Sequence, residues 1–118
     1  MLSQLHNSGI RECLGAVLPD NTKQILSCAD WDFGWHIVYN YEDHVMPLLP
    51  KGTTLHVTSW HDNTEANRWN DDPRNSAGFG QRSSDEMSFA WVSWYDLDDE
   101  AFEKAVEERE MAADNNNN

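Results

Sequence analysis

The chain has 118 residues, with 21 acidic and eight basic side chains and a formal net charge of −13. Its length suits one domain, and its charge repels phosphate backbones and anionic lipid headgroups, which excludes nucleic acid and membrane surfaces as expected partners. Residues 96–114 carry nine of the acids and only two of the bases, so most of the imbalance belongs to the C-terminal end. Six tryptophans in the chain predict a folded domain rather than a disordered tail.

The chain shows neither a membrane span nor an export signal. No apolar stretch approaches the roughly 20 residues that a spanning helix needs. The first seven residues, Met-Leu-Ser-Gln-Leu-His-Asn, lack the basic and apolar regions of a signal peptide. A soluble chain is expected, and an exported origin stays open if the chain is a piece of a longer protein.

A β-hairpin is predicted near the N-terminus. Residues 9–17 and 23–28 contain apolar side chains and flank the turn-forming sequence Pro-Asp-Asn-Thr at 19–22. If the Asp and Asn are the two central residues of the turn, Cys13 stands directly opposite Cys28. Opposed residues have Cα atoms about 4.5–5.5 Å apart, which allows a disulfide. In an exported protein we expect these two cysteines to form the bridge. In a reducing cytosol we expect them to remain free thiols.

Three further stretches have the alternation of strands. Residues 33–41 place their aromatic side chains on one face, and residues 53–61 alternate in the same way. Residues 62–83 are rich in Asn, Asp, Gly, Pro and Ser and predict a long loop. In the strand expected at 84–95, Met87 shares one side with aromatic residues.

The C-terminal end predicts one acidic helix. Asp98 is a suitable N-cap for a helix from Asp99 to about Met111, with a narrow apolar stripe on the outside of the sheets. The resulting fold class is all-β, an antiparallel, jelly-roll-like β-sandwich with one acidic C-terminal helix. The expected division is a β-sandwich domain over residues 1–96, the helix over 97–112 and a disordered Asn tail over 113–118.

A specific motif follows the long loop. Residues 80–91 read Gly-Gln-Arg-Ser-Ser-Asp-Glu-Met-Ser-Phe-Ala-Trp, and a Trp-His-Asp-Asn-Thr sequence at 60–64 precedes the loop. With Asp-Phe-Gly-Trp at 32–35 and Leu-Pro-Lys-Gly-Thr at 49–53, these sequences resemble the C-terminal domain of the copper type II, ascorbate-dependent monooxygenases. That group includes peptidylglycine α-hydroxylating monooxygenase, and the bacterial members are the most similar. The resemblance covers roughly residues 4–96.

The resemblance implies a copper site. In that family a Met of this motif and a His-x-His pair hold the copper that binds oxygen and hydroxylates a substrate carbon. By position Met87 is the thioether ligand and His6 the second imidazole, whereas Gln4 stands where the first His belongs. An amide oxygen is a poor ligand for soft Cu(I).

The resemblance also implies partners and a location. Ascorbate would supply electrons through a second copper, which the family holds in a separate N-terminal domain. The expected partner is that domain or a separate electron-transfer subunit, and the expected location is periplasmic or secreted. This chain alone is not expected to complete the reaction.

Other interpretations of the same residues remain open. Met87 between aromatic residues suits a core position, and a scaffold that lost its copper would be a non-catalytic binding or structural module. His61 beside Asp62 is a weak candidate for a metal ligand or a hydrolase base, because adjacent strand residues point to opposite faces. Arg82 and Asp85 are expected to pair beside Met87. The apolar stripe of the helix offers a contact for a homo-oligomer.

Overall fold

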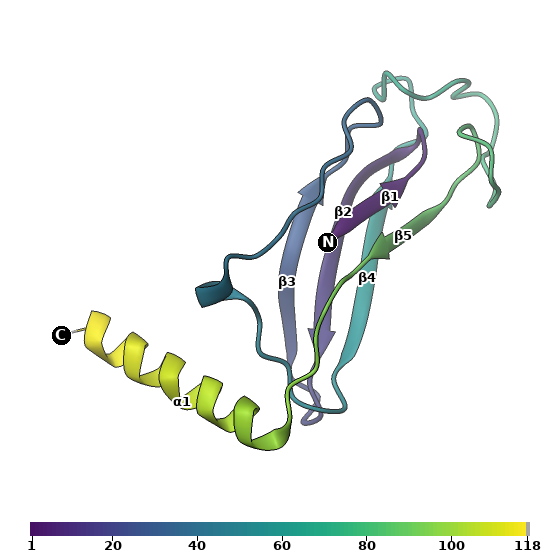
Figure 1. Ribbon diagram of the computed structural model, residues 1–118. Coiled ribbons are helices and arrows are strands. Elements are labelled where there is room, and N and C mark those ends of the chain that lie inside the picture. Colours follow the sequence, from purple (N-terminus) through teal and green to yellow (C-terminus); the bar gives the residue numbers. More distant parts are fainter. Residues whose placement is uncertain (118) are drawn as a thin grey trace.

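The computed structural model describes residues 1–117, in which two antiparallel sheets are followed by one helix (Figure 1). The elements, in chain order, are β1 (Leu2–Leu5), β2 (Gly9–Val17), β3 (Lys23–Asp30), the 3-10 helix η1 (Asp43–Val45), β4 (Thr54–His61), β5 (Ser88–Trp91) and α1 (Asp99–Asn116). One sheet has the strand order β3-β2-β4, and the other consists of β1 and β5. The prediction of a β-rich antiparallel chain with one C-terminal helix is confirmed.

The β2–β3 hairpin has the predicted pairing but a different turn. Cys13 pairs with Cys28, and the two residues form a disulfide. The turn is longer than predicted, because Leu18 and Thr22 still share a hydrogen bond and Asn21 has a φ of 67°. A register shift after Leu14 compensates for the extra turn residue. The prediction of a two-residue turn was therefore wrong, although the cysteine pair derived from it is confirmed.

The β1–β5 pair crosses one face of the three-stranded sheet (Figure 1). Two fully buried side chains, Leu5 and Glu12, lie at this contact, and Ser88 of β5 donates a hydrogen bond to the Glu12 carboxylate at 3.1 Å. The buried apolar core is small and lies around β2; its members are Leu5, Cys13, Leu14, Ala16 and Ala29. The two sheets are not closed around a common interior.

The strand predicted at 33–41 does not form. The carboxylate of Asp32 accepts a hydrogen bond from the backbone of Gly34 at 2.9 Å, and the Asp32 carbonyl accepts one from Trp35 at 2.9 Å. These two bonds bend the chain into a turn. Beyond the turn, only Val38 and Tyr39 approach β1, through one isolated bridge and two bonds to Met1. The alternating side chains of this stretch therefore belong to a loop, in which Trp35, Ile37 and Tyr39 are exposed.

The strand predicted at 84–95 is shorter. The β5 ladder covers only Ser88–Trp91, because these are the residues that β1 pairs with. Before it, the chain turns at residues 82–85, and after it, residues 92–98 run extended to the helix. Met87 thus lies immediately before the strand rather than inside it. By contrast, β4 begins one residue later than predicted, and the loop at 62–83 contains no strand.

Helix α1 begins as predicted and ends later. The Asp98 side chain accepts a hydrogen bond from the Ala101 backbone at 2.8 Å. The helix continues through Asn116, so it includes residues 113–116, which had been assigned to the tail; Asn118 lies outside the described residues. Figure 1 shows α1 projecting away from both sheets. Within residues 1–117, no helix is long and apolar enough to cross a membrane.

Candidate functional site

The β1–β5 ladder ends beside two of the predicted ligands. Its last pairs are Gln4 with Phe89 and Leu5 with Ser88; His6 follows Leu5 and Met87 precedes Ser88, and both lie just outside the ladder. Opposed residues of an antiparallel pair point to the same face. Leu5 is buried against the larger sheet, so its strand neighbour Gln4 belongs to the outer face of the pair, whereas His6, just beyond the strand, is itself buried.

The His6 ring is held by the backbone. Its Nδ1 lies 3.1 Å from the carbonyl oxygen of Asp85. A carbonyl can only accept, so Nδ1 carries the proton and donates, and in the neutral ring Nε2 keeps its lone pair. This arrangement is the usual one for a histidine that binds a metal through Nε2. The imidazole is also 93% shielded from solvent, which limits its motion.

A turn at residues 82–85 presents that carbonyl. The Asp85 carboxylate accepts hydrogen bonds from the Arg82 backbone at 3.1 Å and from its guanidinium at 3.1 and 2.8 Å. The Arg82 guanidinium lowers the pKa of the Asp85 carboxyl. A Cβ on Gly80 would collide with the Asp85 side chain, so only glycine fits there. The predicted Arg82–Asp85 pair is confirmed.

The long loop encloses Asn7, the residue after His6. The Asn7 backbone donates to the Ser83 carbonyl at 3.1 Å, and its carbonyl accepts from the Asn67 side chain at 2.9 Å. The Asn7 side chain donates to Asp71 at 3.3 Å. Asn67 also donates to the Asp62 carbonyl at 2.9 Å, so one amide joins the start of the loop to the turn after β1. Neither asparagine was predicted, because nothing distinguishes them from the other asparagines in sequence.

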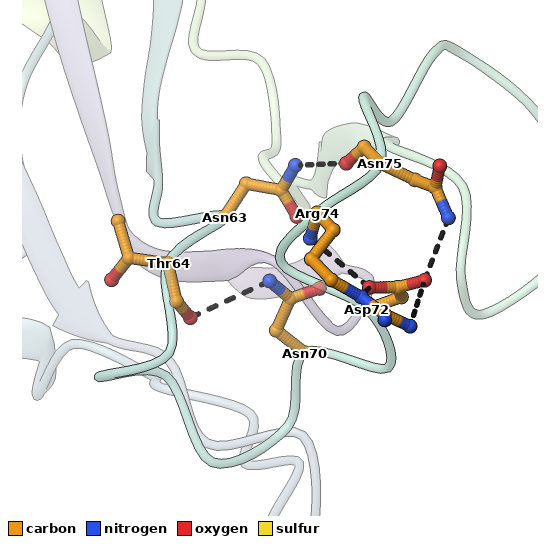
Figure 2. A network of polar contacts seen from close by, with 6 residues as sticks. All are labelled: Asn63, Thr64, Asn70, Asp72, Arg74 and Asn75. Carbon is orange, nitrogen blue, oxygen red and sulfur yellow. Dashed lines mark hydrogen bonds and ion pairs between the residues drawn. The ribbon is translucent and has the colours of Figure 1, made fainter.

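The remainder of the loop is stabilised by its own polar side chains (Figure 2). The Asp72 carboxylate accepts from Arg74, at 3.0 Å from its backbone and 2.9 Å from Nε, and from the Asn75 side chain at 2.7 Å. The hydrogen bonds from Arg74 lower the pKa of Asp72. Asn63 donates to the Asn75 carbonyl at 3.0 Å. These bonds hold the outer part of the loop in a defined shape.

Glu12 lies between the larger sheet and the β1–β5 pair. Its side chain is fully buried between the sheets, and burial raises its pKa. One carboxyl oxygen accepts from Ser88, the neighbour of Met87, and the other has no hydrogen-bond partner among the described residues. The nearby Ser3 hydroxyl also lacks a partner. No structural or functional role was predicted for Glu12 from the sequence.

The other candidate histidine has a different environment. Both ring nitrogens of His61 contact hydroxyls, Nδ1 at 3.1 Å from Ser8 and Nε2 at 3.4 Å from Ser59. The Asp62 carboxylate does not face His61; it accepts from the Thr64 backbone at 2.9 Å, and its bonds with Thr64 lower its pKa. Within residues 1–117, no group of three or more His, Cys, Asp or Glu side chains is placed to hold a metal ion. That finding does not concern thioether ligands such as Met87.

Comparisons of the chain with protein-family models, with curated proteins and with solved structures found no match. What the fold and the described contacts define is a β-rich antiparallel chain in which a buried His6 lies against the 82–85 turn, two residues before Met87.

Proposed function

We propose that this chain is the copper-binding domain of an ascorbate-dependent monooxygenase, with Met87 and His6 as the protein ligands. The observation that supports the proposal is the β1–β5 ladder, whose last pair, Leu5 and Ser88, is flanked directly by His6 and Met87. The Nδ1 contact of His6 with Asp85 supports it, since that contact leaves Nε2 free for a metal.

The donor set fits copper better than other metals. A thioether is a soft ligand that favours Cu(I), and an imidazole serves both copper oxidation states. A bound copper would supply the electron transfer and oxygen chemistry that hydroxylates a substrate carbon. The residues of this chain would hold the ion: the Asp85 carbonyl orients His6, and the loop bonds to Asn7 restrain the turn beside it.

The proposal includes parts outside these residues. A second copper domain or an electron-transfer subunit would pass electrons from ascorbate, and a complete jelly-roll-like sandwich would enclose the site. A periplasmic or secreted location is part of the same proposal. The Cys13–Cys28 disulfide supports it, because such bridges persist in oxidising compartments.

One residue favours an alternative, a non-catalytic binding module on the same scaffold. Gln4 lies on β1 two residues before His6, at the position where a third ligand would be needed, and its amide is a weak donor for Cu(I). With two strong ligands instead of three, the site would bind copper weakly or have lost it.

Titration of Cu(I) against a coloured competing chelator separates the two functions. Met87→Leu removes the sulfur with little change in volume, and we expect it to lower the Cu(I) affinity at least tenfold. Met111→Leu, on an exposed position of α1, is the matched control and leaves the affinity unchanged. Equal affinities of wild type and Met87→Leu would contradict the copper assignment.

A gain of affinity is the sharper test. Gln4→His adds a second imidazole two residues from His6, so Cu(I) affinity rises at least tenfold. Excess Cu(I) then raises the thermal midpoint of the variant more than that of wild type, since a ligand of the native state stabilises it. Gln24→His, on exposed β3, is the control. If Gln4→His and Gln24→His bind equally, Gln4 does not belong to a copper site.

A further inference from the structure

The three-stranded sheet is covered over only part of its inner face. Where β1 and β5 do not reach, Leu14, Leu26 and Leu55 face a groove of about 790 Å³. The other walls of the groove are residues 46–53, residues of α1 including Phe102 and Arg109, and residues 92–97, which Figure 1 shows as a single extended stretch running from β5 to α1. Such an apolar groove is the part of a β-protein interior that a second layer of chain normally fills.

Residues 92–97 have the properties of an unpaired strand. They continue β5 in extended form, and their backbone makes no hydrogen bond to any other described residue. Two consecutive aromatic side chains, Trp94 and Tyr95, are 73% and 69% exposed. The stretch contains no proline and no lysine, the residues that usually protect a free strand edge.

The chain exposes more surface than a compact monomer of its mass, and both the projecting α1 and the uncovered sheet contribute to the excess. A compact monomer of 13.6 kDa exposes about 6,600 Å², whereas this chain exposes 8851 Å². The excess of roughly 2,300 Å² compares with the ~1,000–2,500 Å² that each subunit contributes to an obligate dimer. A second copy of the chain is large enough to cover the groove and also to pair with the free backbone of residues 92–97, whereas a small ligand of the groove's size would leave that backbone unpaired.

We propose that a second copy of this chain covers the groove, with residues 92–97 of the two copies paired as antiparallel strands. A twofold axis at Trp94 opposes Trp94 to its own copy, Ser93 to Tyr95, and Val92 to Asp96. No carboxylate stands opposite another carboxylate in this register. Because adjacent strand residues point to opposite faces, the added strand turns the side chains of one of its faces toward the groove.

The acidic helices do not prevent this pairing. An antiparallel arrangement places the two copies of α1 at opposite ends of the paired segment, on the order of 20 Å apart or more at 3.3 Å per residue. That separation exceeds the Debye length of about 8 Å at physiological ionic strength. Because each copy carries −13, added salt strengthens the association.

Sedimentation equilibrium tests the proposal on the whole chain. We expect a mass of twice 13.6 kDa at micromolar concentrations in ~0.15 M salt, with a dissociation constant that falls when salt is raised. Trp94→Thr weakens the dimer at least tenfold, whereas Phe79→Thr, at an aromatic residue that is 87% exposed on the loop, leaves it unchanged. A monomer under all these conditions overturns the proposal, as does a dimer that is insensitive to Trp94→Thr.

A crosslink tests the register. Because the twofold axis passes through Trp94, two copies of Trp94→Cys have Cα atoms about 4.5–5.5 Å apart and form an intersubunit disulfide under mild oxidation. Phe79→Cys is the control and stays monomeric on a non-reducing gel. Equal crosslinking of the two variants contradicts the proposed pairing. Far-UV circular dichroism confirms that each variant is folded, since both positions are exposed.

Discussion

Glu12 is a carboxyl group enclosed between two sheets with only part of its hydrogen bonding satisfied. Ser88 donates to one oxygen, while the other oxygen has no partner among the described residues. Burial raises the pKa of Glu12, so the native state holds its proton more tightly than the unfolded state does. The free energy of unfolding therefore falls as the pH rises from about 4.5 through the raised pKa.

Glu12→Gln removes this pH dependence. The amide keeps an acceptor for Ser88 and adds a donor for the unpartnered Ser3 hydroxyl, without a charge to bury. At pH 7 we expect the variant to be more stable than wild type by about 1–3 kcal/mol, the usual cost of an unsatisfied buried group. At pH 4 the two proteins converge. Urea unfolding at both pH values measures the difference, and a less stable variant at pH 7 would show that the carboxylate is needed.

Asn67 is a second residue whose importance follows from its contacts alone. Its side chain donates to the carbonyls of Asn7 and Asp62 and accepts from the backbone of Trp69 at 3.0 Å. Asn67→Ala leaves these backbone groups without partners and lowers the free energy of unfolding by about 2 kcal/mol. Asn70→Ala, which removes one bond of 3.4 Å, is the control with a cost below about 1 kcal/mol. If thermal unfolding shows the same loss of stability for Asn67→Ala and Asn70→Ala, the loop does not depend on Asn67.

At the scale of elements, the hairpin is the unit that the sequence specifies best. Its two strands flank a turn-forming sequence, and its two cysteines are opposed. A disulfide that closes a loop of 15 residues contributes about 3 kcal/mol. Reduction of wild type should lower the free energy of unfolding by that amount. The free energy of unfolding of the double variant Cys13→Ala, Cys28→Ala should not change when reductant is added. If it does change, the loss of stability in wild type does not come from the disulfide.

Two other elements were mispredicted for different reasons, one because a local turn overrides its alternation and one because its length depends on a distant partner strand. The 33–41 stretch alternates like a strand, but the Asp32 carboxylate captures the Gly34 backbone and turns the chain. The length of β5 is set by its partner β1 rather than by its own pattern. In contrast, the Asp98 cap and the start of α1 were predictable, because capping is local.

The candidate site also has a predictable part and an unpredictable part. The Arg82–Asp85 pair lies within the sequence motif around Met87, so this pair was predictable. The neighbourhood of His6 and Met87 follows from the pairing of β1 with β5, two strands far apart in sequence. The contacts from Glu12, Asn7 and Asn67 join segments 60 or more residues apart, so sequence alone did not reveal them.

At the scale of the whole molecule, the chain is much more extended than its length requires. A compact domain of 118 residues has a radius of gyration of about 13–14 Å, whereas the Cα radius here is 18.2 Å. The principal extents of 55 × 30 × 22 Å reflect the projecting helix and the uncovered sheet (Figure 1). The helix is attached mainly at one place, where Arg109 donates to the carbonyls of Met46 and Asp43.

Small-angle X-ray scattering of the Trp94→Thr variant at low concentration and low salt should therefore give a radius of gyration near the 18.2 Å of this structure. Low salt keeps the copies apart, because each carries a charge of −13. Arg109→Gln removes charge-assisted bonds to the 43–46 segment, frees α1 and increases the radius further. A value of about 13–14 Å would mean that the helix folds back over the groove in solution. The same chain would then cover the leucines of the sheet, and no second copy would be needed.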